Sequence, residues 1–141
     1  MKLLFNDNRA DINHDNKERE TPLYITCHQG SIKLWSLLLN DNRIDVNKAD
    51  QSNKTPFCLA CESGYIEIAK LLLDDQRVDI NKADNNGKTP FYFACYKGYI
   101  EIVKYLLACG REIDTNKKDN KGKTARERSN QGKSKIGKEI V

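Results

Sequence analysis

The sequence has 141 residues, 31% of them charged, which is the usual length of one domain with a modest core. Its mean hydropathy of −0.73 and its many charged residues predict a soluble chain. The apolar cluster at residues 3–5 is too short for a signal peptide, and no apolar run approaches the ~20 residues of a membrane span. The net charge of +4 is uneven, with +5 on residues 111–141 and −1 on residues 1–110.

The chain repeats itself at a spacing of 34 residues. TPLYITCHQG at 21–30, TPFCLACESG at 55–64 and TPFYFACYKG at 89–98 align without gaps, and the segments that follow them align as well. LLFNDNRADIN at 3–13 also matches LLLNDNRIDVN at 37–47. Self-similarity at a fixed spacing predicts a stack of similar structural units.

The repeat divides the single domain 1–141 into units. A fourth, weaker copy starts at Thr124, 35 residues after Thr89, with the additional residue within 111–116. A terminal unit needs a polar outer face, and this copy is polar and basic. Whether the chain is complete or a fragment of a longer array is left open. The expected division is the end of a preceding unit at 1–9, repeats at 10–43, 44–77 and 78–111, and a basic partial C-terminal capping repeat at 112–141.

Each unit should begin with two helices. Thr followed by Pro, as at Thr55-Pro56, starts a helix, because Thr caps free N–H groups and Pro suits the first helical position. The first helix is short and ends at a glycine such as Gly64. The next segment, 66–73 in the second unit, has apolar residues on more than one face. We therefore expect the second helix to be covered on several sides.

The end of each unit should project as a turn. An extended piece with alternating apolar residues, Val78 and Ile80, leads to Asp84-Asn85-Asn86-Gly87, which is typical of a turn with positive φ at its glycine. Asn53 stands at the corresponding position of the second unit and is the next best residue for that conformation. One such unit cannot bury its own apolar surface, so the units should stack into a solenoid.

These residues resemble the ankyrin repeat family, whose units read D-x-x-G-x-T-P-L-H-x-A-x-x-x-G-H-x-E-x-V-K-x-L-L. The copy at 84–107 is DNNGKTPFYFACYKGYIEIVKYLL. The resemblance implies an all-α ankyrin-repeat solenoid of helix–turn–helix units with projecting β-turn connectors, with about three full repeats and partial terminal units. Three departures matter, one of which is the polar fourth unit described above. The family's histidine is replaced by Tyr24, Cys58 and Tyr92, which leaves open its usual hydrogen bonds to neighbouring turns, although tyrosine can supply some of them. The repeats have 34 residues instead of 33, which predicts a longer connector after the second helix.

Two short patterns suggest other chemistry, but the repeat explains both. The tripeptide GKT at 87–89 resembles the end of a phosphate-binding loop, yet the glycine that such a loop needs five residues earlier is absent. Cys58 and Cys61 form C-x-x-C, but all three units carry cysteine at the position of Cys61, which indicates a small buried site. No second pair supplies the four ligands of a zinc site. We expect no catalytic residue, no metal site and no cofactor.

The resemblance also implies a function. Ankyrin repeats bind other proteins on a concave surface of turn tips and first helices, so this chain is expected to be a non-catalytic protein–protein interaction module or scaffold. We expect an intracellular, cytoplasmic monomer, with the nucleus also open, whose unidentified partner proteins have an acidic surface. Two alternatives stay open: a targeting domain of a larger ankyrin-containing enzyme, or binding of an acidic partner or nucleic acid through the basic C-terminal region. That region lacks aromatic residues for base stacking, so nucleic acid is not the expected partner, nor is a membrane.

The candidate partner-binding residues occupy the family's surface positions, and they differ from unit to unit. Tyr96 is the first candidate for a hot spot, because tyrosine buries a large area at a low entropy cost. The alternative is that Tyr96 packs on the first helix of the next unit. The strip changes from mixed and acidic to basic along the chain. Its members are Lys17, Glu18, Glu20, His28, Gln29, Gln51, Ser52, Lys54, Glu62, Ser63, Asn85, Asn86, Lys88, Tyr96, Lys97, Asn120, Lys121 and Lys123.

Overall fold

The computed structural model describes residues 11–29 and 31–131, and within them the regular elements are all helices, apart from an isolated bridge between Lys118 and Thr124. The preceding unit expected at 1–9 and the end of the capping repeat at 132–141 lie outside the described residues. The helices are α2 (Pro22–His28), α3 (Ile32–Leu39), α4 (Pro56–Ser63), α5 (Ile66–Asp74), α6 (Pro90–Lys97), α7 (Ile100–Ala108) and α8 (Ala125–Gln131).

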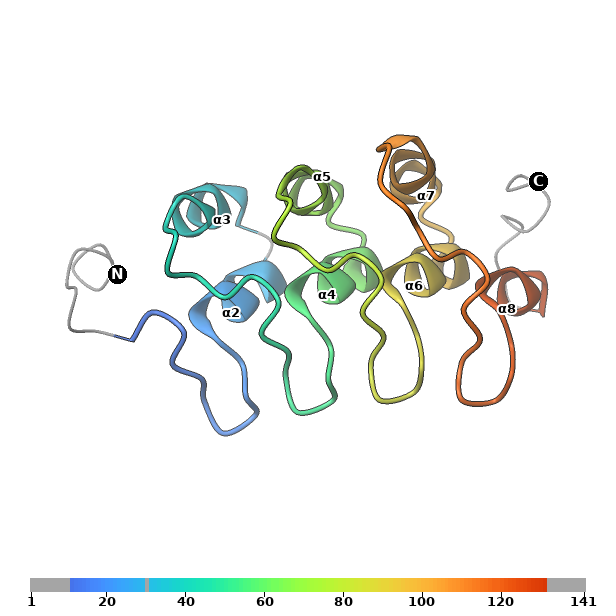
Figure 1. The fold of residues 1–141 in the computed structure, drawn as a ribbon, viewed down its shortest axis with the longest axis horizontal. Coiled ribbons are helices and arrows are strands. Elements are labelled where there is room, and N and C mark those ends of the chain that lie inside the picture. The colour runs from blue at the N-terminus through green and yellow to red at the C-terminus, as the bar shows by residue number, and fades with distance from the viewer. Residues whose placement is uncertain (1–10, 30, 132–141) are drawn as a thin grey trace.

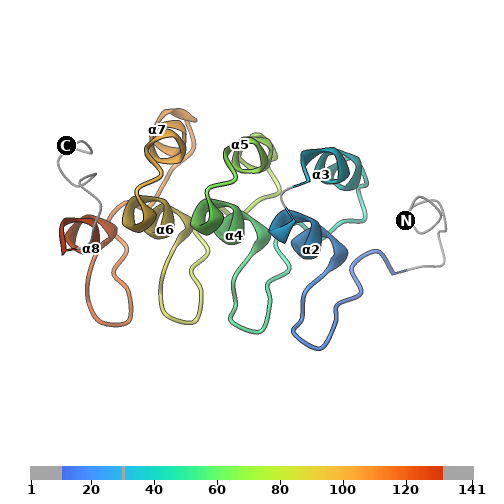
Figure 2. The ribbon, with the colours of Figure 1, turned by 180° about the vertical axis from the view of Figure 1, so that it is seen from behind.

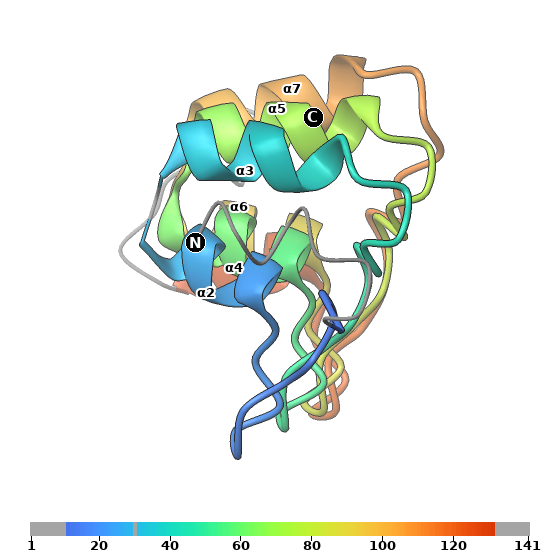
Figure 3. The same cartoon turned by 90° about the vertical axis from the view of Figure 1, so that its left-hand side faces the viewer.

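The helices form two rows. Helices α2, α4, α6 and α8 stand in chain order in one row and α3, α5 and α7 in the other, while the connectors project below as long turns (Figures 1 and 2). Each first helix packs on the first helices beside it, and α5 packs on both α3 and α7. Viewed along the array, the turns point away from the helices on one side (Figure 3). The predicted all-α solenoid is confirmed.

The first helices α4 and α6 begin and end at the predicted residues, whereas the glycine predicted to end α2 lies outside the described residues. The N–H of Cys58 donates to Thr55 Oγ1 at 3.1 Å at the start of α4, and Gly64 ends this helix with φ +78°. The equivalent threonines cap α2 and α6. Helix α8 has a reciprocal cap, because Thr124 Oγ1 accepts from the N–H of Glu127 at 3.2 Å while the Glu127 carboxylate accepts from the N–H of Thr124 at 3.3 Å. Short-range sequence signals therefore set these boundaries.

A continuous core lies between the two rows. Trp35, Phe57, Leu72 and Leu106 are fully buried and come from different helices. The second helices are not covered alike. Helix α5 has no exposed apolar residue, as predicted, but Leu37 of α3 is 56% exposed and that prediction fails there and in α7. The reason is that α5 lies between two second helices, whereas within the described residues α3 and α7 each pack on one.

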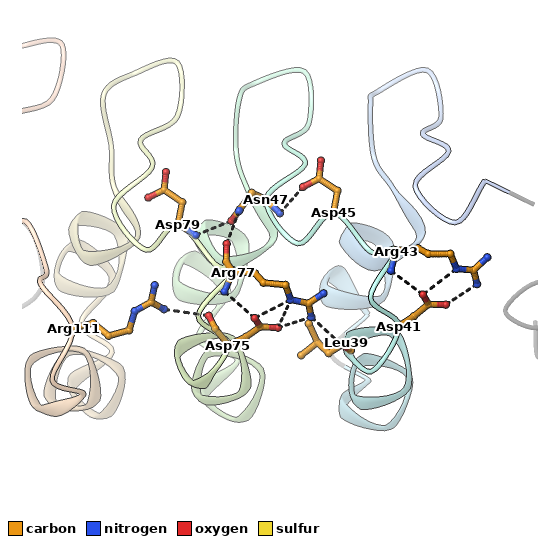
Figure 4. Close-up of polar contacts among 9 residues, drawn as sticks. All are labelled: Leu39, Asp41, Arg43, Asp45, Asn47, Asp75, Arg77, Asp79 and Arg111. Carbon is orange, nitrogen blue, oxygen red and sulfur yellow. Dashed lines mark hydrogen bonds and ion pairs between the residues drawn. The ribbon is translucent and has the colours of Figure 1, made fainter. Parts of the chain in front are cut away.

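The connectors are joined by a row of asparagines. Asn47 Nδ2 donates to the Arg77 carbonyl at 2.8 Å, and Asn47 Oδ1 accepts from the N–H of Asp79 at 2.7 Å (Figure 4). Asn13 and Asn81 make the same pair of bonds to the units that follow them. Asn47 bonds a carbonyl 30 residues later, whereas Asn81 bonds the carbonyl of residue 112, which is 31 residues later. Because α7 ends at Ala108, the additional residue of the third connector lies within 109–111. The predicted range 111–116 shares only residue 111 with this segment.

The turn after each second helix holds an arginine. Arg77 Nη2 lies 2.6 Å from Asp75 Oδ2 and also donates to the carbonyl of Leu39, at the end of α3, at 2.9 Å (Figure 4). Arg111 donates to the carbonyls of Leu73 and Val78 at 3.3 and 2.6 Å. The last carbonyls of a helix lack partners within the helix. Each of these arginines therefore supplies donors to the end of the second helix in the unit before its own.

The glycine that ends α4 allows a test of this packing. Gly64 has φ +78°, and an added Cβ would lie 2.9 Å from the ring of Tyr99, whereas Gly110 has φ +77° and open space. Gly110→Ala should lower the free energy of unfolding by about 1–2 kcal/mol through backbone strain alone. Gly64→Ala should cost about 1–3 kcal/mol more, because the ring has to move. Urea unfolding measures both values, and equal losses would contradict the close packing at Gly64.

Candidate functional site

An aspartate carboxylate shapes each of the last three projecting turns, and an asparagine side-chain oxygen accepts the equivalent two bonds in the first turn. Asp84 Oδ1 accepts from the N–H groups of Asn86 and Lys88 at 2.9 and 3.0 Å, and Gly87 has φ +76° as predicted. Asn53 adopts φ +62° at the equivalent position, which confirms its expected role. The aspartates of the second and fourth turns make the same bonds. These bonds within each turn hold its tip in one conformation.

Hydrogen bonds also join each tip to the next. The N–H of Asn85 donates to the carbonyl of Ser52 at 2.9 Å, and the N–H of Asn120 donates to the carbonyl of Asn86 at 2.9 Å. The Asn120 amide adds a bond from Nδ2 to the carbonyl of Asn85 at 2.7 Å. The row of tips is therefore a connected surface with a fixed spacing of side chains.

Two tyrosines take over the role of the family's histidine. Tyr24 Oη donates to Asp50 Oδ2 at 2.5 Å, and Tyr92 Oη donates to Asp119 Oδ2 at 3.0 Å. Each bond joins a first helix to the turn of the following unit, so tyrosine supplies in two units the contact that the sequence left open. Cys58 at the same position of the second unit is buried and has no hydroxyl to donate.

The candidate residues lie at the tips, at the bases of the turns and on the first helices. The eight tip residues are exposed, and the four residues at the bases are half-buried. On the helices, Gln29, Tyr96 and Lys97 are exposed, Glu62 and Ser63 are half-buried, and the His28 side chain lies outside the described part. The tip residues are Lys17, Glu18, Gln51, Ser52, Asn85, Asn86, Asn120 and Lys121, and the base residues are Glu20, Lys54, Lys88 and Lys123.

Two of the candidates pair with each other. Lys54 Nζ lies 2.5 Å from Glu62 Oε2, with both side chains mostly covered. Burial has the largest effect on the pKa of Lys54 and lowers it, but the hydrogen bond to Glu62 and the nearby negative charges together outweigh burial and raise the pKa. Lys54 Nζ also lies 5.2 Å from the ring centroid of Phe93, within cation–π distance. In the second unit the positive charge is thus already neutralised.

Lys88 has a different environment. Its Nζ lies 5.7 Å from the ring centroid of Tyr92 and 5.9 Å from that of Phe93. Tyr96 stacks on Tyr92 of the same helix, with ring centroids 6.2 Å apart, and remains 45% exposed. Tyr96 thus rests on its own helix and keeps about half of its surface open, and its role as a hot spot stays a prediction.

A hollow of about 300 Å³ opens between the last two turns and helices α6 and α8. Its volume is at the small end of the range for ligand pockets. Five of the candidates contribute to its wall, and three further side chains were not expected there. The candidates are Asn86, Lys88, Tyr96, Asn120 and Lys121, and the others are Tyr92, Asp119 and Arg128.

Asp119 is the buried acid of this hollow. Burial would raise its pKa, but the N–H of Lys123, the hydroxyl of Tyr92, the N–H of Lys121 and the guanidinium of Arg128 together lower the pKa to about 2. The Arg128 bond is 3.1 Å from Nε to Oδ2. The Tyr92 pKa rises to about 12 through burial and its bond to Asp119. The carboxylate is therefore charged and the phenol neutral at pH 7.

The cysteines show no feature of a reactive site. Cys27, Cys61 and Cys95 are fully buried at equivalent positions, and burial raises the pKa of each thiol.

Within 11–29 and 31–131, no group of three His, Cys, Asp or Glu side chains is arranged to hold a metal ion. In the same ranges, no helix is both long and apolar enough to cross a lipid bilayer.

Comparison with known families decides the assignment. A family model described as "Ankyrin repeats (3 copies)" matches residues 1–84 and 76–132. The chain belongs to the ankyrin repeat family. A search of curated proteins found no match. Ankyrin repeats generally mediate protein–protein interaction and are typically non-catalytic.

Sequence reasoning missed three residues of this ankyrin hollow for different reasons. Tyr92 stands at the position of the family's histidine and Asp119 at the turn position equivalent to Asp84, and both also line the hollow. Arg128 falls at the position of Phe93 when the fourth unit is aligned with a shift of 35. This alignment could have identified Arg128 from the sequence, because it shows a cation in place of the aromatic Phe93.

Because Asp119 is charged in the folded protein, it should make a pH-dependent contribution to the free energy of unfolding of this chain. Its folded pKa of about 2 is below the ordinary 3.8, so its stabilisation is complete above about pH 5 and is lost as the pH falls through 3.8 toward 2. Asp119→Asn should lower the free energy of unfolding at pH 7 by about 1–3 kcal/mol. The difference between wild type and variant, measured by urea unfolding, should shrink toward pH 2. Other acids cancel in this difference, and a constant difference would refute the assignment.

Proposed function

We propose that this chain is a non-catalytic module that binds partner proteins through its inner surface. The inner surface is the concave surface formed by the turn tips and the exposed side of the first helices. The observation that carries this proposal is where the units differ. Core positions repeat, with Thr at the start of each first helix and Cys at the equivalent buried position of the first three units. The aligned positions on the first helices that hold His28, Glu62 and Tyr96 differ in every unit.

The scaffold is suited to such a task. The tips are tied to one another through the backbone, and an aspartate, or Asn16 in the first turn, fixes each turn internally. A partner would therefore meet side chains that are already in place, so little ordering entropy is lost on binding. The inner surface is mixed in charge at Lys17, Glu18 and Glu20 and basic at the last two units, which favours a partner with an acidic end.

Three candidates on α6 and its turn test the proposal. Replacing Lys88, Tyr96 and Lys97 together by Ala should reduce capture of specific partners from lysate by about tenfold or more, because an aromatic anchor and two charges are lost. Quantitative mass spectrometry of proteins retained by immobilised wild type and variant measures the change.

The matched control lies on the second helices. Lys33, Lys104 and Leu107 are exposed there, and their joint replacement by Ala removes two cations and one apolar side chain, as the test variant does. This control should capture the same proteins as wild type. If the test variant unfolds at the wild-type urea concentration and still captures the same proteins, the assignment to the inner surface is wrong.

A further inference from the structure

We propose that the hollow between α6, α8 and the last two turns binds a carboxylate side chain, Asp or Glu, from an acidic segment of the partner protein. This inference rests on the proposed function and names the chemistry that the inner surface recognises. It places Lys88 and Arg128 as the groups that meet the carboxylate, with Tyr92 and Tyr96 as the aromatic wall.

The first argument is a comparison of two units of the same chain. Lys54 and Glu62 form an ion pair of 2.5 Å in the second unit, and 34 residues later the same positions are Lys88 and Tyr96. Within the described residues no carboxylate pairs with Lys88, whose ammonium group instead lies near two aromatic rings. The second unit thus contains the filled form of the site, and a partner's carboxylate would supply in the third unit what Glu62 supplies internally.

The second argument is the charge around the hollow. Lys88, Lys121 and Arg128 bring three cations to its wall, against the single carboxylate of Asp119. That carboxylate is 7% exposed, and each of its oxygens already accepts two hydrogen bonds. An ionised carboxylate has about four acceptor sites, so Asp119 is saturated and faces inward. The side open to solvent therefore remains positive.

The third argument separates a protein carboxylate from nucleic acid. Binding to nucleic acid spreads over many phosphates along a basic track. Here the positive charge is concentrated at the last two units, and the first turn presents Glu18 and Glu20. Tyr96 has one face on Tyr92, which leaves a single face for contact. A small positive hollow of this kind suits one acidic side chain.

A blocked tetraglutamate peptide, with blocked tetraglutamine as its neutral match, tests the proposal by NMR titration. The glutamate peptide should shift resonances of Lys88, Tyr96 and Arg128 in a saturable way, and the glutamine peptide should not. Tyr96→Glu should raise the Kd at least about tenfold, because the new carboxylate pairs with Lys88 as Glu62 pairs with Lys54. Tyr96→Gln removes the same ring without adding charge and should change the Kd by less than about threefold.

The reverse substitution should create a site. Glu62→Gln removes the internal partner of Lys54, so the glutamate peptide should now also shift resonances around Lys54 and Phe93. This gain of binding cannot result from loss of folding, since a destabilised variant would not acquire a second saturable site. Absence of shifts at Lys54 in a folded Glu62→Gln variant would contradict the comparison of the two units.

Other results would overturn the proposal. They are equal effects of Tyr96→Glu and Tyr96→Gln, shifts spread over all lysines without saturation, and tighter binding of a thymidylate tetramer to the same resonances. Failure of the proposed function is distinct, because it appears as unchanged protein capture by the triple alanine variant. If that variant loses its partners while Tyr96→Glu and Tyr96→Gln behave alike, the interaction surface stands and only the carboxylate site is rejected.

Discussion

An acceptor side chain at the base of each projecting turn, a carboxylate in the last three turns and the Asn16 amide in the first, makes the interaction on which the rest of the molecule depends. It satisfies two N–H groups of its own turn through one oxygen, as Asp84 does for Asn86 and Lys88. In the second and fourth turns the other oxygen accepts a tyrosine hydroxyl from the unit before. The same group therefore shapes the turn and fixes its position against the neighbouring helix. The rigid row of tips follows from this arrangement.

The fold could be predicted from the sequence because its determinants are local and repeated. Thr55, Pro56 and Gly64 set the ends of α4 through atoms within a few residues, and the repeat makes the same prediction three times. The turn could be predicted for the same reason, down to the positive φ of Asn53. The covering of the second helices was only partly predictable, since the exposure of Leu37 depends on how many neighbours a helix has.

The candidate site was less predictable, because its geometry depends on side chains that meet across units. The exposed tip positions followed from the repeat, but the pairing of Lys54 with Glu62 depends on side-chain reach between a turn and a helix. The contact of Arg128 with Asp119 joins residues of one unit through a carboxylate that also serves Tyr92 of another. The sequence pattern shows which residues differ between units, but it does not show which of them form ion pairs or hydrogen bonds with each other.

The arginines after the second helices have a consequence for how the chain acquires its structure. Arg77 reaches back to the end of α3, and Arg111 reaches back to the end of α5. The ends of α3 and α5 are thus each bonded by a residue synthesised 38 positions later. During synthesis from the N-terminus, a unit leaves the ribosome with its last helical carbonyls still hydrated and becomes fully bonded only when its successor has emerged. The array is directional, and each unit closes the one before it.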